Sequence, residues 1–184
     1  MFLLFFKGNA SISLDIFDGL LPTLVIILQI AQDAFNGAFT RNALNLQTNH
    51  LKQAQLIVNG TILPPQGYQL ETTTNDDPNN PNAVWFPARY MKTYVEVLHA
   101  CGLSALAVAP SIDMGAFVGG SFLLAWDLLP DRKTPIDTRH LKDRGAIRFT
   151  AELHRPLAEP TVLLCMFITD RTVISKASGI VDVV

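Results

Sequence analysis

A short polar turn between two apolar runs constrains the fold more than any other feature of the chain. Asn59-Gly60 lies at the centre of the segment from Gln53 to Leu63. Both residue types tolerate the positive φ that a two-residue hairpin turn requires. Pro64-Pro65 follows, and proline cannot donate a hydrogen bond to a β-ladder. The pattern predicts a β-hairpin whose second strand ends at these prolines.

Other segments have the apolar patterns of short strands. Ser11 to Ile16 alternates apolar and polar residues, which is the period of a half-buried strand, and Asp18-Gly19 is expected to end it. Leu24 to Ile30 is apolar and β-branched, as is typical of a strand buried on both faces. Three more strands are predicted in the second half of the chain: Ser121 to Leu128, Ala146 to Leu153 and Val162 to Ile168.

Only one segment has the period of a helix. Between Phe86 and Cys101 tyrosines and apolar residues recur at helical spacing, Pro87 suits a first turn, and Gly102 can end the helix. We therefore expect one short amphipathic helix inserted between strands. Because regular strand–helix alternation is absent, the whole pattern favours an all-β sandwich over a parallel α/β fold.

Composition limits the classes of function. The 184 residues fit a single domain, with 49% apolar and only 16% charged residues, a balance that argues against disorder. The net charge of -2 and the lack of a polybasic tail argue against sequence-specific or wrapping contacts with nucleic acid. Met1 to Phe6 lacks the pattern of a signal peptide, and Leu20 to Ile30 is too short to span a bilayer. No membrane insertion is expected.

The sequence carries no recognisable catalytic, cofactor or metal constellation. The four histidines, His50, His99, His140 and His154, do not have metal-ligand spacing. No nucleophile elbow or phosphate-binding glycine loop is present, since Gly115 and Gly119-Gly120 lead into a predicted strand instead of opening a helix. We therefore expect no enzyme, no cofactor and no metal site.

The chain has two cysteines. Cys101 and Cys165 are isolated in apolar contexts; both are expected to be buried thiols, although a bridge between them cannot be judged from sequence.

The segment from Arg132 to Arg148 carries six Lys or Arg residues against two acids. It could contact an acidic partner, such as a neighbouring subunit's rim or packaged nucleic acid. A solvated loop and strand face is the favoured interpretation, because charge runs usually lie in water.

The order of these elements, from about Leu14 to Val173, resembles the second jelly roll of the double-jelly-roll major capsid proteins of Polinton/Maverick elements and adinto-like viruses. Six pieces carry the resemblance in order: Phe35-Asn36-Gly37, the Val58 to Pro65 hairpin, the tyrosine-bearing stretch Tyr90 to Leu98, the aromatic run Phe122 to Asp131 that ends in Asp-Leu-Leu-Pro-Asp, the Gly-led strand Gly145 to Phe149, and the final strand Thr161 to Asp170.

The resemblance implies a structural virion protein, often retained in host genomes as an endogenous viral element. Residues 1-184 would form a single jelly-roll domain, the second half of a longer two-domain capsid protein. It would self-associate as a homotrimer and form trimeric capsomers of an icosahedral DNA-virus-like shell. Its partners would be neighbouring capsid subunits and a penton-type minor capsid protein. It would reside in the virion capsid, assembled in the nucleus or cytoplasm of the host cell. The alternative is a free-standing β-sandwich that binds a glycan or a peptide.

Overall fold

The computed structural model describes residues 2–70, 88–102, 112–128 and 144–169, with two short strands beyond them. The strands are β1 (Phe2–Phe6), β2 (Ser11–Leu20), β3 (Leu24–Ala31), β4 (Leu51–Val58), β5 (Thr61–Gln69), β6 (Leu123–Asp127), β7 (Arg144–Leu153), β8 (Thr161–Ile168), β9 (Val173–Ser175) and β10 (Val181–Val183). The helices are α1 (Gln32–Phe35), α2 (Ala88–Ala100) and α3 (Met114–Gly119).

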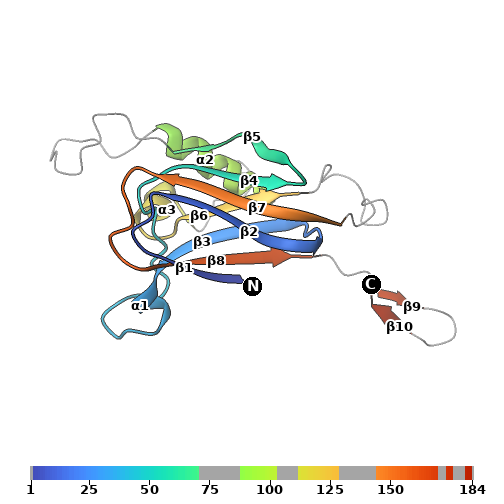
Figure 1. Ribbon diagram of the computed structural model, residues 1–184, viewed down its shortest axis with the longest axis horizontal. Helices are drawn as coiled ribbons and strands as arrows, with labels where there is room; N and C mark the ends of the chain where they lie inside the picture. Colours follow the sequence, from blue (N-terminus) through green and yellow to red (C-terminus); the bar gives the residue numbers. More distant parts are fainter. Residues whose placement is uncertain are drawn as a thin grey trace.

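Eight of these strands form two four-stranded antiparallel sheets (Figure 1). Sheet A has the order β1-β8-β3-β6, and sheet B has the order β2-β7-β4-β5. The first strand pairs with the eighth, the second with the seventh, the third with the sixth and the fourth with the fifth. The chain is thus a long hairpin wrapped so that successive strand pairs alternate between the two sheets. This confirms the predicted all-β sandwich.

The alternating burial of β7 shows why these residues form a sandwich. Ile147, Phe149, Ala151 and Leu153 are buried, while the residues between them are exposed or half-buried. The same alternation brings Val25 and Ile27 of the central strand β3 into the space between the sheets. Burial of each such large apolar side chain contributes about 1.5–3 kcal/mol.

Two expected strand ends were wrong. β2 does not stop at Asp18-Gly19, because β7 provides a backbone partner there: Asp18 pairs with Ala146 and Gly19 with Gly145. A register shift between Asp15 and Phe17 accommodates the longer strand.

The second strand of the hairpin also continues past Pro64-Pro65, to Gln69. The prolines nevertheless disturb the ladder. The register passes from Leu56 opposite Leu63 to Ala54 opposite Tyr68, so Pro64 to Gly67 face a single residue of β4. β5 is the edge strand of sheet B, where proline is tolerated because one side of the strand needs no ladder partner.

The predicted helix is confirmed as α2, which packs against β5, β6 and α3 at one edge of the sandwich. Tyr90 and Tyr94 of α2 are buried against Phe122 and Phe117, with ring centroids 6.2 and 5.2 Å apart. Two short helices, α1 and α3, were not predicted. Gly115 and Gly119 lie inside α3, which corrects the expectation that these glycines only lead into a strand.

Candidate functional site

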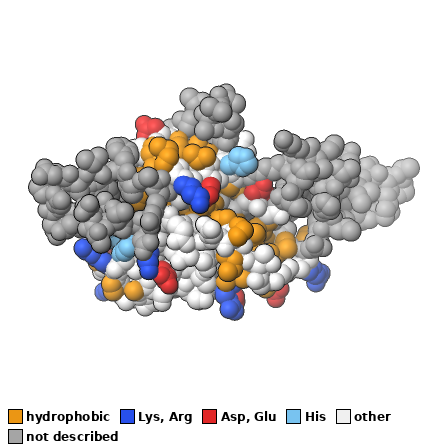
Figure 2. All heavy atoms as spheres, turned by 90° about the horizontal axis from the view of Figure 1, so that it is seen from above, with side chains coloured by type: hydrophobic (Ala, Val, Ile, Leu, Met, Phe, Trp, Pro, Cys, Tyr) orange, Lys and Arg blue, Asp and Glu red, His pale blue; other side chains and the backbone are white. Residues whose placement is uncertain are grey.

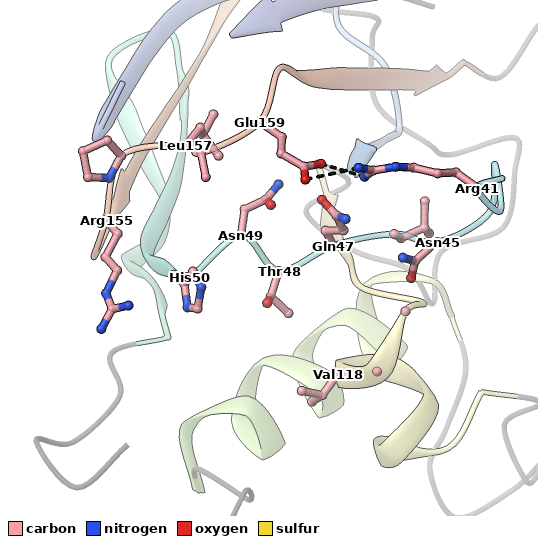
Figure 3. Close-up of a pocket in the computed structure, with 15 residues that line it drawn as sticks. Arg41, Asn45, Gln47, Thr48, Asn49, His50, Val118, Arg155, Leu157 and Glu159 are labelled. Atoms are coloured by element: carbon pink, nitrogen blue, oxygen red, sulfur yellow. Dashed lines mark hydrogen bonds and ion pairs between the residues drawn. The ribbon is translucent and has the colours of Figure 1, made fainter. Parts of the chain in front are cut away.

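A cavity of about 570 Å³ lies where three connections meet: the α1–β4 connection, the β7–β8 connection and the end of α3 (Figure 3). Its lining mixes polar and apolar side chains with two glycines. The lining residues are Arg41, Asn45, Leu46, Gln47, Thr48, Asn49, His50, Val118, Gly119, Gly120, Arg155, Pro156, Leu157, Ala158 and Glu159. Its size is within the range of pockets that hold small ligands.

Backbone hydrogen bonds hold the cavity wall from residue 45 to residue 50 on three sides. The Leu46 amide donates to the carbonyl of Gly120 at 2.7 Å, and the Gln47 amide donates to the carbonyl of Gln29 in β3 at 2.9 Å. The His154 amide donates to the carbonyl of His50 at 2.9 Å. The wall is therefore fixed to α3, to sheet A and to the β7–β8 connection.

The same wall contains two consecutive residues with unusual backbone angles. Asn49 has a φ of 48° and His50 a φ of 53°, values that non-glycine residues adopt infrequently. The Asn49 amide group donates to Oε1 of Gln29 at 2.8 Å, and the Gln29 side chain is almost fully buried. This buried hydrogen bond helps to hold Asn49 in place. Asparagine and histidine adopt this region more readily than other non-glycine residues, so the conformation marks a defined turn in the wall.

The charged residues of the cavity are not equivalent. Arg41 forms a two-pronged pair with Glu159, at 2.6 and 3.2 Å, and its Nε lies 2.8 Å from Asp33. The hydrogen bond to Glu159 raises the pKa of Arg41, and the guanidinium in turn lowers the pKa of Glu159. Among the described residues, Arg155 has no such carboxylate partner. It lies at the His50 end of the cavity, away from the Arg41–Glu159 pair (Figure 3).

The outer face of sheet A is a second candidate, because it is apolar although it faces away from the core. Three rows cross β8, β3 and β6: Leu164, Leu28 and Leu123; Met166, Ile26 and Ala125; Ile168, Leu24 and Asp127. Met166 is 39% and Ile168 44% exposed, Ala125 is fully buried, and the other six residues are half-buried. Asp127 is the one polar residue of the nine. We call these nine residues the apolar face.

The outer face of sheet B is polar at eight of the nine corresponding positions, and Ile57 is the exception. Its rows across β2, β7 and β4 are Ser11, Glu152 and Gln53; Ser13, Thr150 and Gln55; Asp15, Arg148 and Ile57. Sheet B therefore has the ordinary amphipathic pattern of a sheet with one solvated face, whereas sheet A is apolar on both faces. Contiguous apolar surface of this kind normally marks an interface.

Hydrophobic side chains are also exposed elsewhere. On the side of α2 and β5, Met91, Val95 and Ile62 are exposed, and Figure 2 shows hydrophobic groups between charged ones on this side of the molecule. In the α1–β4 connection Phe39 and Leu44 are also exposed.

The histidines and cysteines considered in the sequence analysis do not come together in one site. His50 lines the cavity, His99 lies near the end of α2, His154 follows β7, and His140 lies outside the described residues. Cys165 is buried, and burial raises its pKa to about 12; Cys101 is half-buried, and the two do not form a disulfide.

Neither a metal site nor a membrane span was found in the described part of the chain. No three His, Cys, Asp or Glu side chains there lie close enough together to hold a metal ion. None of the described helices has the length and apolar character needed to cross a membrane.

Most of the basic segment from Arg132 to Arg148 lies outside the described residues. Its last members do not: Arg144 is exposed at the start of β7, and Arg148 forms an ion pair with Asp15 on the outer face of sheet B. The Asp-Leu-Leu-Pro-Asp exit is described only as far as Leu128.

Sequence reasoning missed the cavity. The positive φ of Asn49 and His50 and the pairing of Arg41 with Glu159, 118 positions away, leave no local pattern in the sequence. Comparison with protein-family models, with curated proteins and with solved structures gave no match. The class of protein that the fold defines is the antiparallel β-sandwich.

Proposed function

We propose that the chain is a structural capsid subunit whose single jelly-roll domain packs with copies of itself into trimeric capsomers of an icosahedral, DNA-virus-like shell. In this proposal the domain corresponds to the second jelly roll of a Polinton- or adinto-type major capsid protein. It has no catalytic role, and it is located in the virion capsid. Fold alone does not define function, so the proposal depends on a surface feature as well.

The strand order supports the jelly-roll part of the proposal. A jelly roll is a double-sheet, eight-stranded architecture with Greek-key connections. Rolling a long hairpin of eight strands into a sandwich produces the two strand orders found here, β1-β8-β3-β6 and β2-β7-β4-β5.

The apolar face is the observation that carries the shell function. A monomer that stayed alone in water would be expected to have polar residues on the outer face of both sheets, as sheet B has. Sheet A instead presents a grid with Met166, Ile26 and Leu28 on its outer side. A shell subunit needs such a surface, because each copy must bury area against its neighbours.

The test is the mass of the purified chain in solution. We expect trimers or larger species by light scattering coupled to size exclusion. Met166→Lys places a charge in the middle of the apolar face and should shift the species to monomers. Thr150→Lys is the matched control, because Thr150 lies on the outer face of the central strand β7 of sheet B and should leave the assembly intact.

A wild-type chain that remains monomeric at high concentration would contradict the proposal and favour the alternative of a free-standing binding module. Assembly that survives Met166→Lys but is lost with Thr150→Lys would place the interface on sheet B and contradict the role given to the apolar face. Co-expression with a first jelly roll, if a neighbouring reading frame encodes one, should further increase the yield of soluble assembly.

A further inference from the structure

The cavity next to His50 and Arg155 has the properties of a small-ligand site that a shell subunit does not require. It is bordered by segments far apart in the chain, and its wall is held by hydrogen bonds to three different elements. Because the wall is already ordered before binding, less conformational entropy is lost when a ligand binds. The consecutive positive φ angles of Asn49 and His50 form a defined turn in this wall.

From the lining we infer that this cavity binds an acidic sugar, a polyhydroxylated ring that carries one carboxylate. The inference is independent of the proposed shell function, because it depends on the cavity alone. Each part of such a ligand has a counterpart in the lining: its charge, its hydroxyl groups and its apolar ring or acetyl carbons.

The charge comes first. Arg41 is already neutralised by Glu159 and Asp33, so Arg155 is the cavity's remaining guanidinium among the described residues. A guanidinium matches a carboxylate through two parallel hydrogen bonds. A phosphate monoester carries about two negative charges at neutral pH, and one guanidinium would leave that charge only partly compensated.

The hydroxyl groups come second. Asn45 and Gln47 have side-chain amides that both donate and accept hydrogen bonds, and Thr48 adds a hydroxyl. A sugar hydroxyl also donates and accepts, so these side chains suit a sugar better than they suit a simple anion. In Figure 3 Thr48 and Gln47 lie between the Arg155 end and the Arg41 end of the cavity, and Asn45 lies at the Arg41 end.

The apolar part comes third. Val118 of α3 and Leu157 of the β7–β8 connection line the same cavity, and Leu157 is buried. They offer apolar contact to the CH groups of a sugar ring or to the methyl of an N-acetyl group. The volume of about 570 Å³ is sufficient for one or two sugar rings.

Isothermal titration calorimetry of the 184-residue chain tests the inference. The probes are N-acetylneuraminic acid and glucuronic acid, with N-acetylglucosamine and glucose as neutral counterparts and acetate as the bare carboxylate. We expect the acidic sugars to bind at least about tenfold more tightly than the neutral sugars and than acetate, since a charge-assisted bond is added to the hydroxyl contacts.

Three variants locate the site. Arg155→Ala should remove the preference for acidic sugars, about a tenfold loss, and leave neutral-sugar binding unchanged. Thr48→Val should weaken acidic and neutral sugars alike. Arg144→Ala is the matched control, because it removes an exposed arginine of β7 that does not line the cavity. Both exposed arginine variants should keep the wild-type melting temperature.

Several results would overturn the inference. Equal affinity for acetate and for the acidic sugars would make the cavity a general carboxylate site. Equal affinity for acidic and neutral sugars, or unchanged binding by Arg155→Ala, would remove the assigned role of Arg155. Absence of heat with every probe, in a chain whose melting temperature shows it to be folded, would also contradict it.

Discussion

Asn59 links the hairpin turn to the neighbouring strand β7. Its φ of 49° shapes the turn, its amide donates to the carbonyl of Ala146 at 3.1 Å, and its side-chain Oδ1 accepts from the Ala146 amide at 3.0 Å. This position of the side chain restricts Gly145. A Cβ on Gly145 would lie 2.7 Å from Cγ of Asn59 and closer still to its amide atoms. Packing therefore explains why the strand from Gly145 to Phe149 opens with a glycine.

Gly145→Ala should lower the free energy of unfolding by about 1–3 kcal/mol, the usual cost of overpacking a fixed site. The measurement is urea denaturation followed by tryptophan fluorescence. In the Asn59→Gly background the alanine should cost much less, because the colliding side chain is gone and glycine accepts the turn angle. A full cost in both backgrounds would show that the collision with Asn59 is not the cause.

Asp15 and Arg148 form an exposed pair across β2 and β7, with two hydrogen bonds at 2.6 and 3.2 Å. The hydrogen bond from Arg148 lowers the pKa of the Asp15 carboxyl. A carboxyl with a lowered folded-state pKa stabilises the fold above its unfolded-state pKa, and this contribution is lost as the pH falls through the folded-state value.

Asp15→Asn should therefore reduce stability at pH 7 and have a smaller effect at acidic pH, because the wild-type carboxyl takes up its proton as the pH falls through the folded-state pKa. The effect at pH 7 should be small, since exposed pairs contribute little. Denaturation midpoints of the wild type and the variant at both pH values provide the measurement. Ser13→Asn, in the next row of the same strand face, is the control. A difference that persists unchanged in acid would contradict the assignment.

At the scale of elements, the β4–β5 hairpin combines a regular turn with an irregular edge. The turn residues Asn59 and Gly60 have φ angles of 49° and 84°, as a two-residue turn with positive φ at both positions requires. Beyond it, Gly67 returns the chain to the ladder with a φ of 65° and lies too close to the carbonyl of Ala54 for a Cβ, which would be 2.8 Å away. Trp126 supports the edge by donating from Nε1 to the carbonyl of Leu63 at 2.9 Å.

Gly60→Val should destabilise the fold by about 1–3 kcal/mol, because a β-branched residue is strained at positive φ. Open space surrounds the position, so backbone strain and not collision is the cause. Gly60→Asn should cost less, since asparagine tolerates this region. Thermal melts of the three proteins measure the effect. Equal melting temperatures for the valine and asparagine variants would contradict the strain argument.

At the scale of the whole molecule, the two sheets share one core but differ on the outside. Leu56 and Phe149 of sheet B and Val25 and Leu163 of sheet A are fully buried between them. The outer face of sheet B is solvated and charged, while the apolar face of sheet A has Met166 and Ile168 in contact with solvent. The asymmetry gives the molecule one side that is suited to association.

If the apolar face is buried on self-association, the melting temperature should rise with protein concentration, because association stabilises the folded chain by mass action. Calorimetry over a hundredfold range of concentration measures this dependence. Met166→Lys should remove it, and Thr150→Lys should keep it. A wild-type melting temperature that does not change with concentration would indicate that the folded chain does not associate.

Local patterns in the sequence predicted much of the fold. The alternation of Ala146 to Leu153, the strand of Leu24 to Ile30, the Asn59-Gly60 turn and the helix near Tyr90 to Leu98 are all found in the structure. The expected burial of the Leu24 to Ile30 strand on both faces was wrong, because its outer residues from Leu24 to Leu28 are only half-buried. Each of these signals depends on side chains a few positions apart, which is the range over which strand and helix periods operate.

Other features needed the tertiary structure. β2 continues through Asp18-Gly19 because β7 lies beside it, and β5 continues past its prolines because it lies at an edge. α3 is too short to show a helical period. The cavity joins Arg41 to Glu159 and His50 to Arg155 across more than half of the chain. Residue type and local spacing thus determined the sandwich and its turns, whereas the strand partners and the candidate site followed only from long-range packing, because contacts between distant segments leave no periodic signal in a single sequence.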